Sequence, residues 1–316
     1  MNTEMLTPQS GKGLYRGKFD TEGKLIQVFG IDVAITGTIL RIAHLETDSY
    51  ESLDDPQAMI DGLRKSGISI DLFTFMQIMP ETAPKYHYPM EWDNLAVLPV
   101  STFDHWWTRQ IDGKTRNMVR RAEKKGVVVQ EADFNDVLVQ GISEIYNECP
   151  VRQGRPVHHY GKDIETVRKE TATFRTTSIF IGAFLNSKLI GFAKLTTDQT
   201  RTHAGVMHII SMIQHRDKAP TNALIAQAVR SCVDRGIPFL FYTKFAFGNK
   251  QRDSLADFKH NNGFRRVDLP RYYVPLTRMG SLAFRFGLHH NVLDYVPEPV
   301  LTKYRELRSA WYNRKI

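Results

Sequence analysis

The order of helix and strand patterns between residues 126 and 276 constrains the fold of this chain more than any other feature. Short apolar or alternating runs are interspersed there with longer segments whose apolar residues recur every three or four positions, as Leu224, Ala228 and Cys232 do. The expected strands are 127–130, 178–184, 189–196, 206–212, 239–244 and 266–275, and the expected helices are 136–149, 163–174, 220–234 and 254–262. This β-α-α-β-β-β-α-β-α-β order predicts an α/β (α+β) protein with a mixed, mostly antiparallel sheet flanked by helices.

The first hundred residues predict a smaller N-terminal α/β domain. Strand patterns fill 26–46, Asp55-Pro56 begins a helix pattern that ends near Lys65, and 68–76 is another strand pattern. Four prolines then break residues 80–100, which predicts a linker. The expected domain ranges are 1–100 for the N-terminal domain, 101–278 for the main domain and 279–316 for a C-terminal helical tail.

Charge and cysteine content narrow the setting. The 42 Lys and Arg residues against 34 Asp and Glu give a net charge of +8, which fits either an anionic partner or a solvated basic surface. No apolar run is long enough to span a membrane, and the first twelve residues lack a signal-peptide pattern. Cys149 and Cys232 are too few for a disulfide framework or a zinc cluster, so we expect a cytoplasmic protein.

Familiar catalytic motifs are absent from the sequence. It contains no phosphate-binding P-loop, no dinucleotide-binding glycine motif, no H-E-x-x-H and no G-x-S-x-G. The histidine pairs His158-His159 and His289-His290 are adjacent, and neighbouring side chains diverge in a helix or a strand. No metal site is therefore expected.

A basic segment with aromatic residues covers 102–125. Trp106 and Trp107 precede the cations, which are Lys114, Arg116, Arg120, Arg121, Lys124 and Lys125. Such a helix fits phosphate or RNA binding, or a solvated face whose tryptophans anchor one side to the core.

The junction between the 206–212 strand and the 220–234 helix is the most informative local feature. Residues 213–219 deliver the chain to Pro220, a residue suited to the first position of a helix. The free backbone N–H groups of that first turn, with Arg216 and Lys218, would form a pyrophosphate site. An ordinary helix start explains the same residues.

This junction resembles the GNAT acyl-coenzyme A N-acyltransferase superfamily over residues 126–276. In that family a strand feeds a Q/R-x-x-G-x-G/A loop that cradles the coenzyme A pyrophosphate, and Gln214, Ala219 and Pro220 fit the pattern. Asp217 replaces the middle glycine, so either its side chain turns outward with Arg216 or Lys218 compensating, or the binding mode is altered. In the second matching block, 254–264, Lys259 stands where the family's acid tyrosine belongs. The Phe258-Lys259 form is similar to the FemAB-like branch.

The resemblance implies an N-acyltransferase that moves an acyl group from acetyl-CoA or another acyl-CoA to an amine. It implies donor contacts on the strand, the loop, the helix start and the second block: Ile210, Ser211, Gln214, Arg216, Lys218, Ala219, Thr221, Asn222 and Lys259. His208 is the candidate base, because its ordinary pKa is near neutrality, and Tyr242 is the candidate acid. Either side chain is equally explained by core packing.

The acceptor is expected at the irregular stretch 150–162. The candidate substrate-binding residues there are Arg152, Arg155, His159 and Tyr160. Arginines bind phosphate or carboxylate bidentately, which suggests an anionic small molecule or an envelope or polysaccharide precursor. The alternative is a surface loop whose arginines pair with Glu144 or Glu148.

Two other functions remain open on the sequence. The Phe-Lys form and the basic helix favour a FemAB-like transferase that takes an aminoacyl group from tRNA. The replaced glycine and tyrosine favour a non-catalytic GNAT-fold binding protein. The tail 279–316 fits peripheral contact with an anionic membrane, a dimer contact or packing within the chain. The acceptor, the acyl length, the oligomeric state and the origin of the N-terminal domain stay open.

Overall fold

The computed structural model describes residues 24–46, 53–152, 155–198, 200–246, 254–290 and 303. Contacts divide the chain into two units, 1–95 with 267–292 and 96–266 with 293–316. This division differs from the predicted continuous ranges, because the strand β13 (Arg265–Pro275) begins in the second unit and ends in the first. The predicted ranges are continuous in sequence, so they placed the whole strand in the main domain, 101–278.

The first unit is built on a small mixed sheet. Its strands are β1 (Lys24–Val28), β2 (Ile31–Thr36), β3 (Ile42–Leu45), β4 (Leu72–Met76) and β13, in that order. All neighbours are antiparallel except β3 and β4, which are parallel and joined through α1 (Pro56–Lys65). The predicted helix start is confirmed, since the Asp55 side chain accepts a hydrogen bond from the N–H of Ala58 at 2.9 Å. A second helix, α8 (Arg278–Arg285), follows β13.

The predicted linker at 80–100 is wrong over its second half. Residues Met90–Pro99 form the ten-residue strand β5, and its apolar run 95–98 is buried. Three of the four prolines precede the strand and Pro99 is its last residue. The prolines therefore bound the strand instead of interrupting it, a position where the missing N–H is tolerated.

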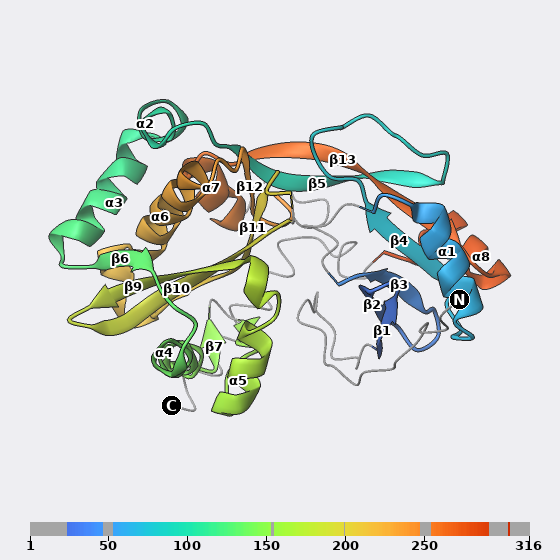
Figure 1. The fold of residues 1–316 in the computed structure, drawn as a ribbon, viewed down its shortest axis with the longest axis horizontal. Coiled ribbons are helices and arrows are strands. Elements are labelled where there is room, and N and C mark those ends of the chain that lie inside the picture. The colour runs from blue at the N-terminus through green and yellow to red at the C-terminus, as the bar shows by residue number, and fades with distance from the viewer. Residues whose placement is uncertain are drawn as a thin grey trace. The chain divides into compact units, whose positions relative to one another are not determined.

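The second unit contains the predicted mixed sheet with helices on its faces (Figure 1). The strands, in spatial order, are β5, β12 (Phe239–Phe241), β11 (Ala204–Ser211), β10 (Lys188–Thr197), β9 (Ser178–Leu185) and β6 (Val128–Glu131). Only β11 and β12 are parallel, so the expected mostly antiparallel sheet is confirmed. Two helices, α6 (Pro220–Asp234) and α7 (Ser254–Asn261), lie on one face, with α4 (Asp136–Tyr146) and α5 (Ile164–Thr171) on the other.

Two local irregularities shape the central strands. Asn186 and Ser187 have positive φ, 49° and 64°, and form a two-residue turn between β9 and β10. In β11 the pairing shifts between His208, opposite Lys194, and Val206, opposite Leu195, which leaves a bulge at Met207.

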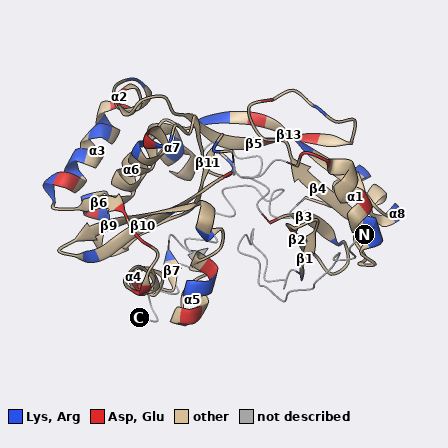
Figure 2. Ribbon diagram, viewed as in Figure 1, with Lys and Arg blue, Asp and Glu red and all other residues tan. Residues whose placement is uncertain are grey.

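The basic segment 102–125 is not one continuous helix. A short helix α2 (Phe103–His105) and a π-helical turn (Trp106–Gln110) precede α3 (Gly113–Lys124), whose start is capped by Asp112. Trp106 is buried and its indole N–H donates to the carbonyl of Asn262 at 3.0 Å, so the tryptophan does anchor this segment to the core. Figure 2 shows Lys and Arg along α3, and Lys114, Arg120, Arg121 and Lys124 are exposed.

Among the described residues, no helix combines the length and the apolar character that crossing a membrane requires.

Candidate functional site

The two parallel strands of the second unit separate soon after they begin to pair. β11 and β12 pair only at Ala204 with Leu240 and at Gly205 with Phe241. The pairing between β11 and β12 ends at Gly205. A cavity of about 580 Å³ lies at this opening and is bounded by the end of β11, the start of α6 and the first turn of α7.

Eight of the predicted site residues line this cavity. They are Arg152, predicted for the acceptor, and Ile210, Ser211, Arg216, Ala219, Thr221, Asn222 and Tyr242. Met118 of α3 and Phe258 of α7 contribute apolar wall. The structure therefore brings together most of the residues predicted for the donor and one of the two predicted for catalysis.

The start of α6 leaves its first-turn amides without a side-chain cap. Ala219 occupies the N-cap position in the left-handed region, with φ 54° and ψ 41°, and Pro220 follows at the first helical position. Thr221 at the helix start and Ser211 at the strand end are joined through their hydroxyls at 2.8 Å. Uncapped N–H groups and the positive end of the helix dipole thus face a cavity, which is the arrangement that binds phosphate.

The backbone edge of β11 supplies further donors to the cavity. Met212 donates its N–H across to Ile190 of the β10 side, and the carbonyl of Ser211 accepts from Arg152 on the opposite side. Because N–H and C=O groups alternate along an antiparallel strand, the amides of Ile209 and Ser211 point away from β10. These two amides therefore point toward the opening, and both follow the bulge at Met207.

An ion pair that sequence analysis treated only as an alternative holds the 213–219 loop. Glu148 accepts hydrogen bonds from the N–H groups of Ile213 and Gln214, at 2.7 and 3.0 Å, and pairs with Arg152 at 2.9 Å. Arg152 also donates to the carbonyls of Ser211 and Ile145. Arg152 thus supports the 213–219 loop and also lines the cavity, and its role as an acceptor-binding residue stays a prediction.

Three predicted donor contacts do not line the cavity. Asp217 is exposed and pairs with Lys218 at 3.1 Å, so the acidic side chain turns outward and Lys218 compensates it. The hydrogen bond from Lys218 lowers the pKa of Asp217. Gln214 turns its amide to the sulfur of Met212. Lys259 is completely buried, donates to the carbonyl of Lys244 and lies 4.7 Å from the Tyr242 ring, so its predicted phosphate contact is wrong.

The predicted base lies on the other face of the sheet, in a buried cluster of rings. His208 faces His159, with ring centres 5.8 Å apart, and lies beside Phe192. His159 stacks on Tyr146 at 4.2 Å. The Nε2 of His208 and the hydroxyl of Tyr146 are both buried, and neither has a hydrogen-bond partner in the part of the chain that the structure describes. Two unpaired polar atoms in one cluster mark a place that a polar ligand or water would satisfy.

Burial lowers the pKa of two basic groups in this cluster, His208 and Lys194. Burial, with the nearby His159 and Lys194, lowers the pKa of His208 to about 3. Burial also lowers the pKa of Lys194, opposite His208 on β10, to about 7. The Lys194 ammonium donates to the carbonyl and the hydroxyl of Thr173. The sequence did not predict a role for Lys194, because a lysine within a strand pattern gives no sign that it is completely buried.

A carboxylate completes the cluster. Glu170 of α5 accepts two hydrogen bonds from Lys162 and lies 3.3 Å from His159. Although burial raises the pKa of Glu170, its bonds to His159 and Lys162 lower it to about 2. Of the other predicted acceptor residues, Tyr160 is about half exposed, and the side chain of Arg155 lies outside the described residues.

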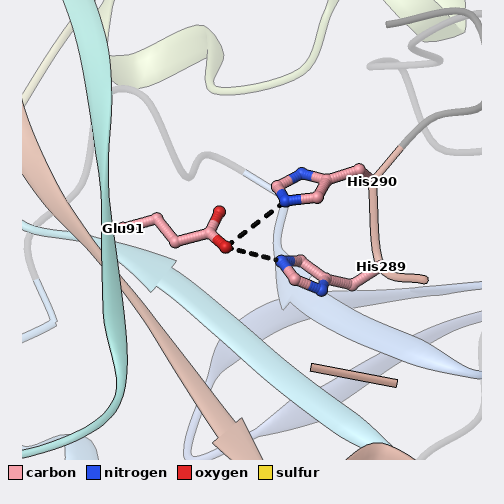
Figure 3. A group of neighbouring side chains, drawn as sticks. All are labelled: Glu91, His289 and His290. Carbon is pink, nitrogen blue, oxygen red and sulfur yellow. Dashed lines mark hydrogen bonds and ion pairs between the residues drawn. The ribbon is translucent and has the colours of Figure 1, made fainter. Parts of the chain in front are cut away.

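The histidine pair at 289–290 contradicts the expectation that adjacent side chains diverge. The pair lies in a turn after α8, within the first unit, and both Nε2 atoms point to one oxygen of Glu91 (Figure 3). The divergence argument applies to helices and strands, and this turn is neither.

Comparison with solved structures identifies the fold. The chain is similar to L-PGS from Bacillus licheniformis, with a TM-score of 0.54, 14% identity and coverage of 83% of this chain and 88% of that one. FemX matches with a TM-score of 0.52, 10% identity and coverage of 84% and 90%. The C-terminal domain of a protein described as a lysylphosphatidylglycerol synthetase, from Agrobacterium fabrum, matches with a TM-score of 0.55, 11% identity and coverage of 84% and 88%.

No protein-family model and no curated protein sequence matches the chain. The structural likenesses establish the GNAT-like fold that the sequence predicted, and at these identities they establish the fold alone.

Proposed function

We propose that the protein is an N-acyltransferase that takes its acyl group from an acyl-CoA and passes it to an amine. The observation that carries the proposal is the 580 Å³ cavity at the separation of β11 and β12, with the uncapped start of α6 as one wall. The coenzyme A pyrophosphate would bind the amides of that helix turn, with Arg216 as its charged partner. Asp217 presents no obstacle, because its carboxylate points to solvent and pairs with Lys218.

The acyl carbonyl would lie against the edge of β11. The amides of Ile209 and Ser211 point to the cavity side, where they would stabilise the oxyanion that forms when the amine attacks the thioester. Tyr242 lines the same cavity and would donate a proton to the departing thiolate.

The acceptor amine would enter from the His208 side of the sheet. An amine buried there loses its proton easily, because Lys194 in the same cluster has a pKa of about 7. With a pKa of about 3, His208 is a poor proton acceptor, so its neutral imidazole would accept a hydrogen bond from the amine through Nε2 and orient it. The second proton, released as the amide bond forms, would pass to water.

Thermal shift with acetyl-CoA, longer acyl-CoAs and free coenzyme A tests the donor. A ligand at about 100 times its Kd should stabilise the second unit by about 2.7 kcal/mol. Arg216→Ala should weaken binding by about tenfold or more, since a charge-assisted hydrogen bond is lost. The matched control, Lys169→Ala, removes an exposed charge outside the cavity and should bind as the natural protein does. Absence of any shift with all these ligands would refute the proposal.

An aminoacyl-tRNA donor is the second candidate, and the position of α3 favours it. α3 packs against α6 and the 213–219 loop, and Met118 of α3 lines the cavity. The helix therefore presents its exposed cations next to the proposed donor site. Among the structures that share the fold, the name lysylphosphatidylglycerol synthetase itself describes an aminoacylated product.

Charge reversal at Arg120 and Arg121 separates the two donors. Both side chains are exposed, whereas Arg116 donates to the carbonyls of Trp107 and Ile111 and should be left intact. A tRNA donor requires steeply salt-dependent binding that the reversal abolishes. Acyl-CoA binding should be unchanged in the same variant.

A further inference from the structure

A group of metal-ligating side chains lies in the first unit, apart from the proposed transferase site. Glu91 is the second residue of β5, and His289 and His290 lie in the turn after α8. The Oε1 atom of Glu91 is 3.2 Å from Nε2 of His289 and 3.3 Å from Nε2 of His290, and the three candidate ligand atoms lie within 4.8 Å of one another (Figure 3).

The backbone of the turn explains why two adjacent histidines point the same way. Gly287 has φ 67°, and the N–H of Leu288 returns to the carbonyl of Ala283 at 2.8 Å. The N–H of His290 then bonds to the carbonyl of Gly287. The two imidazole rings are consequently stacked at a tilt, with centres 4.0 Å apart, and face Glu91 together.

His289 is held in the orientation of a metal ligand. Its side chain is only 1% exposed and packs against the rings of Tyr273 and Phe284, at 4.6 and 5.1 Å. Its Nδ1 lies 3.4 Å from the carbonyl of Ala283, while its Nε2 faces the carboxylate. A neutral imidazole carries one N–H, so it can satisfy only one of these two oxygens. Donation from Nδ1 to a backbone carbonyl leaves the Nε2 lone pair available, which is the usual state of a metal-bound histidine.

We propose that Glu91, His289 and His290 bind a divalent transition-metal ion of the zinc class. Ligands about 2.0–2.1 Å from a tetrahedral ion are separated from each other by about 3.3 Å, which matches both oxygen–nitrogen distances. Two imidazole nitrogens and one carboxylate suit zinc, iron, cobalt or nickel better than magnesium or calcium. No fourth His, Cys, Asp or Glu joins the group among the described residues, so one coordination position is left to water or an added ligand.

The bound ion would tie the turn after α8 to the beginning of β5 within the first unit. When Nδ1 of His289 carries the proton, the Nε2 lone pair faces the negative carboxylate of Glu91, which is unfavourable. A cation between these two atoms would remove that repulsion. The competing arrangement is an ion pair between Glu91 and a protonated His289, which needs no metal.

Metal titration of the untagged full-length chain, stripped with EDTA, distinguishes the two. Zn²⁺ should bind one ion per chain in calorimetry and raise the melting temperature, and Co²⁺ should give the visible absorption bands of a tetrahedral site. His290→Ala should weaken Zn²⁺ binding by more than about tenfold, at least the loss that removing an outer-shell partner causes. His290 is one-third exposed, so the variant should fold, which circular dichroism and the melting temperature in EDTA would verify.

The matched control is His87→Ala, an exposed histidine of the same unit that lies outside the group and should bind metal normally. Equal binding by the natural protein and His290→Ala would overturn the proposal. A melting temperature that Glu91→Gln lowers in EDTA but that Zn²⁺ does not change would overturn it in favour of the ion pair.

Discussion

Replacing Lys194 with Met should change how the stability of the second unit depends on pH. Lys194 is completely buried and its pKa is lowered from 10.5 to about 7. Between these values the unfolded chain binds a proton at this residue and the folded chain does not, so the free energy of unfolding rises with pH. At about 1.4 kcal/mol per pH unit, the full window of about 3.5 units is worth about 5 kcal/mol. The part between pH 7 and 9 is worth about 2.5 kcal/mol.

Urea denaturation of the natural protein and of Lys194→Met at pH 7, 8 and 9 measures this contribution. The difference between the two free energies of unfolding should move by about 2.5 kcal/mol in favour of the natural protein across the range. Burial raises the pKa of Cys232 to about 12, so its contribution to the free energy of unfolding falls with pH. This contribution is the same in both proteins and cancels in the difference. The control is Lys188→Met, at the exposed start of the same strand, which should give only a constant offset. Parallel pH curves for Lys194→Met would refute a buried, neutral Lys194.

Three further perturbations address the proposed transferase site. In urea denaturation, the free energy of unfolding of Ala219→Gly should exceed that of Ala226→Gly by about 1–2 kcal/mol. Both changes raise the conformational entropy of the unfolded chain equally, but only at position 219 does glycine relieve a left-handed backbone. Equal effects would contradict that backbone. Glu148→Gln should lower the free energy of unfolding by about 2 kcal/mol and weaken donor binding, because Arg152 loses its charged partner. The control is Glu144→Gln, which removes the exposed ion pair with Lys188 and should cost less than about 1 kcal/mol. Tyr242→Phe should lower kcat by about tenfold or more without changing the Kd of the donor, and an unchanged kcat would remove the tyrosine from the acid role.

The fold was predictable where a local pattern decides the structure. Apolar periodicity located α6 over Pro220–Asp234, and alternating apolar runs at 178–184 and 189–196 located β9 and β10. The strand β5 was missed because its prolines were counted without regard to position. The sequence did not predict that β13 ends in the first unit, because local sequence patterns do not show which strands a given strand will pair with.

The candidate site was predictable where residues follow one another in the sequence. Ser211, Ala219 and Thr221 lie within eleven residues on one strand, loop and helix, and the structure places them on one cavity. Glu148 lies 65 residues before its partner Ile213, and the burial of Lys194 depends on Thr173 and on rings from other elements. Such contacts depend on tertiary packing. A single sequence therefore shows which residue types are present but not which residues contact each other.

The geometry of β11 connects the two halves of the proposed site. Its pairing with β12 ends at Gly205, and the end of the strand, Ile209 to Ser211, lines the cavity proposed for the donor. Successive side chains of a strand point to opposite faces, so Ser211 reaches Thr221 of α6 while His208 enters the ring cluster beneath α4 and α5. One short strand thus presents donor-side amides at its edge and a neutral imidazole on the opposite face from α6. A transfer reaction needs this pairing, because the donor carbonyl and the incoming amine must meet from different directions at one backbone segment.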